Sequence, residues 1–175
     1  MSQIEKTVGE LRAMAAGVER AHADIGAADA RAQEITAQAV RSGFAGIATG
    51  LAQVRQSLAE IRGRTAGIAV STTEAITTAG SAVGELSPQQ TITVLAPAQQ
   101  ALSAAMEKIV ATIHKLAETR RMTEAVLRGG QPGPMLTALD SIGQVLEMVA
   151  QRGTVAGQSL NEAIAQARQV GDRGN

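Results

Sequence analysis

The chain contains no cysteine, no tryptophan and no tyrosine, and phenylalanine occurs once in 175 residues. The absence of cysteine excludes disulfide bonds and every site that needs a thiolate as metal ligand or nucleophile. Aromatic side chains contribute much of the stabilisation of ordinary cores and of ligand pockets. We therefore expect thin, closely spaced helices, with no cofactor and no small-molecule ligand.

Clusters of one charge and long apolar runs are also missing. Sixteen basic residues balance sixteen acidic ones, and no segment carries a basic block of the kind that nucleic acids or anionic lipids attract. No stretch reaches the roughly eighteen apolar residues of a membrane span, and the opening MSQIEKTVGE lacks the apolar core of a signal peptide. The sequence predicts a cytoplasmic protein with no membrane span, or one exported without a cleaved signal peptide.

Helix signals run through the whole chain. Ser2 and Glu5 have the spacing of a capping box, which begins a helix. Small and apolar residues then recur at intervals of three and four, which is typical of a helix with one buried face. The first series is Ile4, Val8, Leu11, Ala15, Val18, Ile25, Ala32 and Ala39, and a stronger series runs from Ile47 to Leu86.

The stretch SGFAG, residues 42–46, separates the two series, which are out of phase by one residue. A continuous helix could absorb that shift, but each glycine weakens a helix by about 1 kcal/mol relative to alanine. We favour a tight turn at 42–46 joining helices of about 3–41 and 45–85. Residues 1–86 would then form an N-terminal helical hairpin.

The second half has its own start and stop signals. Ser87 and Pro88 open a helix, but Pro97 lacks the N–H that would continue it, so we expect a connector or short helix over 87–96. A C-terminal hairpin is predicted for 97–171, with its turn in RGGQPGP at 128–134 and a tail at 172–175. The fold class is all-α, with two long antiparallel hairpins packed as an elongated four-helix bundle.

No catalytic apparatus can be recognised. His22 and His114 are the only histidines, and we interpret both as helix-interface residues. Glu19 stands three residues before His22, as in the Glu-x-x-His ligand pair of bundle metal sites, but such sites need two copies and two further glutamates. We expect no metal site and no enzyme.

Two further features suggest contact surfaces. Arg120 falls at a position of its helix that faces the bundle interior. Its side chain would fix the register of a polar layer, pair with a carboxylate of a partner, or extend to the bundle edge. Glycines four residues apart clear a groove for another helix, although a glycine-rich chain also gives such pairs by chance. These pairs are Gly46 with Gly50, Gly63 with Gly67, Gly80 with Gly84, and Gly153 with Gly157.

Phe44 and Gly46 spell Phe-Ala-Gly at the predicted turn. Residues 1–86 therefore resemble the WXG-type helical hairpins that type VII (ESX) secretion systems export, which carry an aromatic-x-Gly at the hairpin turn. Here Phe stands in place of Trp, and a chain without Tyr lacks the Tyr-containing export signal of that family. In this interpretation Phe44 is a buried plug that fastens the end of the hairpin.

The whole chain resembles an uncharacterised helical family of actinobacteria, through GFAGIATG and the GGQPGP turn. We predict a non-enzymatic helical adaptor or chaperone-like partner of another protein, accessory to an exported toxin or to type VII secretion. Phe44, Gly46, Gly50 and Arg120 are its candidate contact residues. The alternative is a self-associating coiled-coil scaffold.

Overall fold

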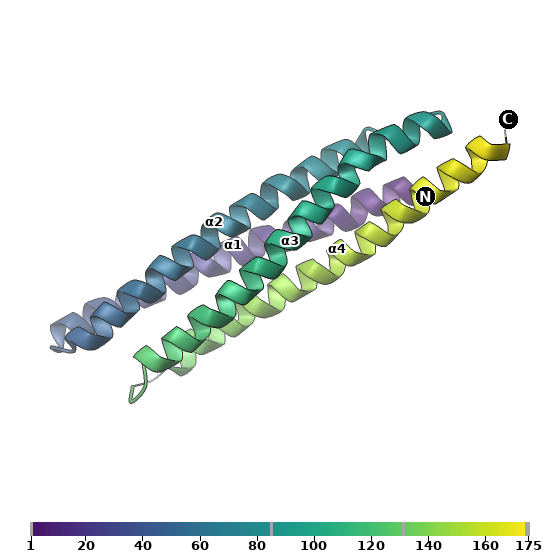
Figure 1. Cartoon of the computed structure of the whole chain (residues 1–175). Coiled ribbons are helices and arrows are strands. Elements are labelled where there is room, and N and C mark those ends of the chain that lie inside the picture. Colours follow the sequence, from purple (N-terminus) through teal and green to yellow (C-terminus); the bar gives the residue numbers. More distant parts are fainter. Residues whose placement is uncertain (1, 85, 131, 174–175) are drawn as a thin grey trace.

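A computed structural model describes residues 2–84, 86–130 and 132–173, and it is an elongated bundle of four long helices (Figure 1). No strand occurs among these residues, which confirms the all-α prediction. The helices are α1 (Gln3–Arg41), α2 (Ala45–Gly80), α3 (Pro88–Val126) and α4 (Gly133–Arg173).

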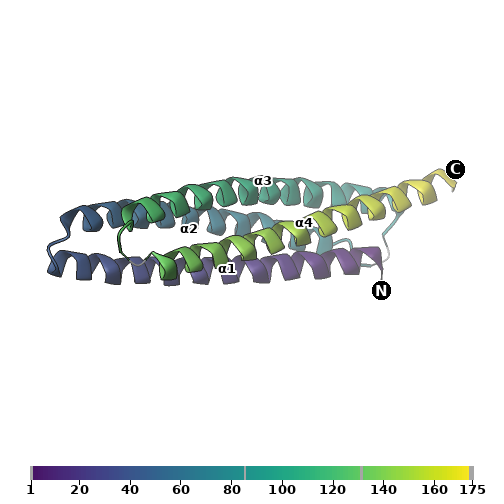
Figure 2. The same ribbon diagram turned by 90° about the horizontal axis from the view of Figure 1, so that it is seen from below.

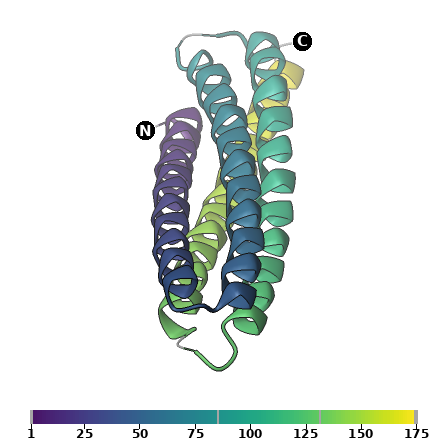
Figure 3. The same ribbon diagram turned by 90° about the vertical axis from the view of Figure 1, so that its left-hand side faces the viewer.

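Each helix packs against two neighbours. Contacts join α1 to α2, α2 to α3, α3 to α4 and α4 back to α1, and over the described residues the diagonal helices do not meet. Both hairpin turns lie at one end of the bundle, and the α2–α3 connection lies at the other with the two termini (Figure 3). We call the first end the turn end and the second the terminal end.

Helix α3 differs from the prediction, because it begins at Pro88 and passes through Pro97 without a break. The start signal is real, since Ser87 Oγ accepts the backbone N–H of Gln90. Pro97 and Thr93, the residue whose carbonyl loses a helical partner, are both exposed, so water can solvate that carbonyl. Packing of the opposite face of α3 against the bundle core therefore outweighs the missing helical hydrogen bond. The prediction of a connector or separate short helix over 87–96 is wrong, because Pro88 to Ala96 form the first turns of α3.

Helix α2 ends at Gly80, earlier than the predicted residue 85. Ser81 caps the helix, and Gly84 has a φ of 145°, which no helix contains. The Ser, Thr and Gly residues of this stretch favour turns over helix. The segment between α2 and α3 is therefore the longest connection in the bundle.

The core contains aliphatic residues and an unusual number of hydroxyl groups. Serines and threonines are buried on α2 and α3: Ser57, Thr65, Ser71, Thr72, Thr112, Thr119 and Thr123. Most donate to a carbonyl of their own helix, and Ser57 Oγ lies 2.6 Å from Thr119 Oγ1. Among the described residues no buried side-chain nitrogen or oxygen lacks a hydrogen-bond partner.

The two hairpins are offset along the bundle axis. Figure 2 shows the α1–α2 turn extending past the beginning of α4 at one end, and the last turns of α4 extending past the N-terminus at the other. The offset leaves part of each hairpin without the other hairpin opposite it. The candidate site lies in one of these uncovered parts.

Candidate functional site at the turn end

The turn between α1 and α2 is built by residues 42–44. Gly43 has a φ of 78°, a left-handed conformation that glycine adopts without strain. The backbone N–H of Gly43 donates to the carbonyl of Val40, and that of Phe44 donates to the carbonyl of Ala39 at 2.8 Å. This pair of bonds is a Schellman motif, which satisfies the last carbonyls of α1. The sequence SGF therefore ends one helix, and Phe44 then occupies the N-cap position of the next.

Phe44 is not the buried plug that the sequence analysis predicted. Its residue surface is 59% exposed. The turn is held by backbone hydrogen bonds, so it needs no aromatic side chain to fasten it. Val40 lies one turn earlier on α1 and is 63% exposed. Single exposed apolar side chains are normal on a protein surface, so the exposure of Phe44 gains its meaning from the apolar hollow beside it.

Phe44 borders a hollow of about 610 Å³ at the turn end, which we call the shelf. Its apolar part comes from both hairpins, with Ile35, Ala39, Phe44 and Ile47 on α1 and α2, and Leu127 and Pro134 near the α3–α4 turn. Arg31, Glu34, Gln38 and Ser42 form its polar rim. The shelf is therefore an apolar floor with a polar border, which is the usual anatomy of a protein-binding surface.

The shelf continues along the bundle as a smaller hollow of about 440 Å³ between α1 and α4. This second hollow shares Arg31 and Glu34 with the shelf, and its floor consists largely of alanines, among them Ala27, Ala28 and Ala138. Short side chains let the backbone of another helix approach closely. The two hollows together form one groove that follows α1.

Two of the four predicted contact residues, Gly46 and Gly50, lie at the start of α2 just after this turn and do not line the shelf. Gly46 is exposed, and a methyl group added to it would meet nothing within 4 Å. A methyl group at Gly50 would come within 2.5 Å of Val126 Cγ2 on α3. The close helix approach predicted for Gly50 is therefore made inside this chain.

Among the other predicted glycine pairs, some glycines also lie close to another helix of this chain and others have open space beside them. Gly153 and Gly157 face Met106 and Leu102 across the α3–α4 interface, so this pair clears a groove within the bundle. Gly63 and Gly80 have nothing within 4 Å of an added methyl group. The four pairs thus do not share one external face.

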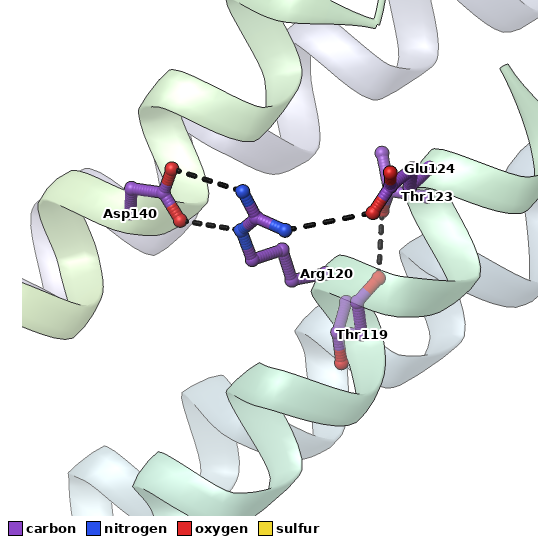
Figure 4. A network of polar contacts seen from close by, with 5 residues as sticks. All are labelled: Thr119, Arg120, Thr123, Glu124 and Asp140. Atoms are coloured by element: carbon purple, nitrogen blue, oxygen red, sulfur yellow. Dashed lines mark hydrogen bonds and ion pairs between the residues drawn. The ribbon is translucent and has the colours of Figure 1, made fainter. Parts of the chain in front are cut away.

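Arg120 lies on the surface between α3 and α4, away from the shelf. Its Nε donates to Asp140 Oδ1 at 2.6 Å, and its Nη1 is 3.6 Å from Glu124 (Figure 4). The hydrogen bond to Asp140, the charge of Asp140 and then that of Glu124 raise the pKa of the Arg120 guanidinium above its ordinary value. Of the three alternatives for Arg120, the structure shows the side chain at the bundle edge, where its carboxylate partner is Asp140 of α4.

The two histidines occupy different environments. His22 Nε2 accepts from Arg62 Nε at 3.2 Å, and His22 Nδ1 lies 3.1 Å from the hydroxyl of Thr65, which itself donates to the Arg62 carbonyl. Both ring nitrogens of His22 are thus engaged at the α1–α2 interface, as a structural residue requires, and neither is free to pair with Glu19. His114 is exposed, so the prediction of an interface residue is wrong there.

No group of three or more His, Asp or Glu side chains that could hold a metal occurs over residues 2–84, 86–130 and 132–173. None of the helices in this part of the chain is both long and apolar enough to cross a membrane.

The fold and the shelf define a class of protein, an up-down-up-down four-helix bundle with an uncovered apolar hairpin tip. No curated protein and no solved structure matches the chain. Residues 86–172 match the model of the Family of unknown function (DUF6244). The match spans α3 and α4, and it confirms the predicted resemblance to an uncharacterised family over this half of the chain. The resemblance of residues 1–86 to WXG-type hairpins stays a prediction.

Proposed function

We propose that this chain is a non-enzymatic helical adaptor or chaperone-like protein, whose shelf receives a helix of another protein chain. The observation that carries the proposal is the exposed Phe44 beside an apolar hollow at the tip of a hairpin. An amphipathic helix lying in an apolar groove is a recurring mode of protein recognition, and aromatic anchors in such grooves supply much of the binding energy.

The test places a photo-crosslinking amino acid, p-benzoylphenylalanine, at position 44 of the full chain in its native host. Val70 is the matched control, because it is 68% exposed on the same helix but lies roughly 40 Å from position 44 at 1.5 Å per residue. We expect the position-44 variant to give a discrete crosslinked protein that the position-70 variant does not. Equal crosslinking at both positions, or none at either, would contradict the proposal.

We further propose that the adaptor serves an exported toxin or a type VII secretion system. The support is the Phe-Ala-Gly sequence at the hairpin turn, which resembles that of WXG-type proteins. The measurement is the distribution of the tagged protein between lysate and culture filtrate, with a cytosolic marker to detect lysis. Appearance in the filtrate without the marker is the expected result, whereas strict retention would leave a cytoplasmic adaptor and remove the link to export.

A self-associating scaffold is the second candidate function. One observation favours it, because the terminal end of the bundle carries a second uncovered apolar surface in addition to the shelf.

A further inference from the structure

The offset between the hairpins can be measured from the contacts between α1 and α4. Glu10 pairs with Arg152 at 3.0 Å, and Gln3 donates to Glu162. The two helices are antiparallel, so these two contacts place the start of α4 opposite residues 29–32 of α1. At 1.5 Å per residue, roughly 14–18 Å of α1 extends past α4 at the turn end, and roughly 17–21 Å of α4 extends past α1 at the terminal end.

The shelf is a continuation of the α1–α4 interface. The face of α1 that packs in the bundle includes Ala28 and Ala32, and the same face continues into Ile35 and Ala39, beyond the first residue of α4. No α4 lies opposite α1 there, so Ile35 and Ile47 are only half-buried and Phe44 is exposed, although Ala39 is buried. The surface that fits the shelf is therefore an apolar helix face like that of α4.

The terminal end has the reverse arrangement. Ala163, Ala167 and Val170 continue the inward face of α4 past the capped start of α1, and they border a hollow of about 260 Å³ together with Ile4 and Leu86. Val170 is 61% exposed. Ala163 and Ala167 are buried and Ile4 and Leu86 are half-buried, so Val170 is the exposed apolar residue where no α1 lies opposite the last turns of α4.

We infer that the occupant of the shelf is the terminal end of a second copy of this chain. The turn end presents α1 without α4, and the terminal end presents α4 without α1, over lengths that are about equal. Two copies can therefore overlap end to end along the bundle axis, and this overlap, which we call a lap joint, continues the four-helix bundle. At full overlap this register would place Val170 of one copy opposite Ile35 of the next, and Phe44 opposite the part of α4 that includes Ala163. This contact is heterologous and does not close on itself, so it repeats along the bundle axis into a linear assembly.

The inference rests on the proposed function of the shelf as a helix-binding surface, and the test uses variants that block one end each. Phe44→Lys charges the shelf and Val170→Lys charges the terminal end, while Val70→Lys places the same charge on an uninvolved exposed site. All three positions are exposed, and circular dichroism checks that each variant keeps the helix content and melting temperature of the wild type. Light scattering and sedimentation then give the mass as a function of concentration.

We expect the mass of the wild type and of Val70→Lys to rise above the 17.9 kDa of one chain as concentration increases. Phe44→Lys and Val170→Lys should each stay at 17.9 kDa alone. Their equimolar mixture should give a dimer and nothing larger, because one intact shelf then meets one intact terminal end.

Three results would overturn the inference. The first is a wild type that stays monomeric up to about 1 mM, beyond the range of specific association. The second is a mixture of the two blocked variants that stays monomeric although the wild type associates, because an intact shelf and an intact terminal end would then have met without pairing. The third is association of either blocked variant by itself, which indicates a symmetric contact between like ends.

The crosslinking and mass measurements together distinguish failure of the lap joint from failure of the adaptor function. A monomeric protein that crosslinks a foreign chain through position 44 would leave the adaptor standing and remove self-assembly. A protein that assembles in line, and crosslinks only its own copies, would support the lap joint and remove the foreign partner.

Discussion

The hydrogen bond between Ser57 and Thr119 allows a quantitative test of the hydroxyl-rich α2–α3 interface. Thr119 Oγ1 donates its only hydrogen to the Lys115 carbonyl at 2.9 Å. Ser57 Oγ must therefore be the donor in the 2.6 Å contact with Thr119 Oγ1. Ser57 is 4% exposed and Thr119 is fully buried, so water cannot replace either partner. The perturbations are Ser57→Ala, Thr119→Val and the double variant.

The direction of the bond makes the two single variants unequal. Ser57→Ala removes one buried hydrogen bond, at about 0.5–1.5 kcal/mol of unfolding free energy, and leaves the bond from Thr119 to Lys115 intact. Thr119→Val keeps the shape but leaves the Ser57 donor buried without its acceptor, which costs about 1–3 kcal/mol. The double variant removes donor and acceptor together, so it should be less destabilised than Thr119→Val alone.

Urea unfolding followed by far-ultraviolet circular dichroism measures all three free energies, and the chain has no Trp or Tyr to serve as a fluorescence probe. The slope of free energy against urea concentration should be unchanged in all three variants, which verifies that only stability differs. Additive losses, or a larger loss for Ser57→Ala than for Thr119→Val, would refute the assigned direction of the bond.

Two further predictions concern stability. Fully burying a Phe side chain contributes about 1.5–3 kcal/mol, so Phe44→Ala, at a residue 59% exposed, should lower the free energy of unfolding by only about 1 kcal/mol. Leu58→Ala, at a fully buried residue, should lower it by about 2–5 kcal/mol, and thermal or urea unfolding measures both. Similar losses in the two variants would contradict the exposed position of Phe44. Gly63→Ala should raise stability by up to about 1 kcal/mol, since the added methyl group meets nothing, whereas Gly50→Ala should gain less or lose stability because its methyl group approaches Val126. Equal gains at the two glycines, measured by melting temperature, would show that Val126 moves aside without cost.

The fold was accessible from the sequence because its helix signals are local. The capping residues Ser2 and Ser87 begin α1 and α3 where the patterns indicate. The turn after Arg41 also falls within the predicted segment. The rule that proline ends a helix was wrong at Pro97, since burial on the opposite face decided the outcome. Local rules cannot measure that contribution.

The shelf was less accessible, because it depends on the register between two hairpins. Phe44 was identified as a special residue, but its expected burial was wrong. The pattern Ser-Gly-Phe was itself the signal of a Schellman turn, in which hydrogen bonds replace a plug. Ile35, Ile47, Leu127 and Pro134 were not predicted to meet, and no spacing along the chain relates them. Arg120 found its partner within the chain for the same reason, since Asp140 comes close only once α3 and α4 are paired.

The order of packing around the bundle has a consequence for how the chain folds. Three of the four interfaces join helices that follow one another in sequence, and only the α1–α4 interface joins the two halves over a long separation. Hairpins with local contacts form quickly, while closure of a long loop carries a larger entropic penalty. We therefore expect the α1–α4 interface to be the last to close during folding. It is also the interface whose uncovered extensions form the shelf and the terminal end.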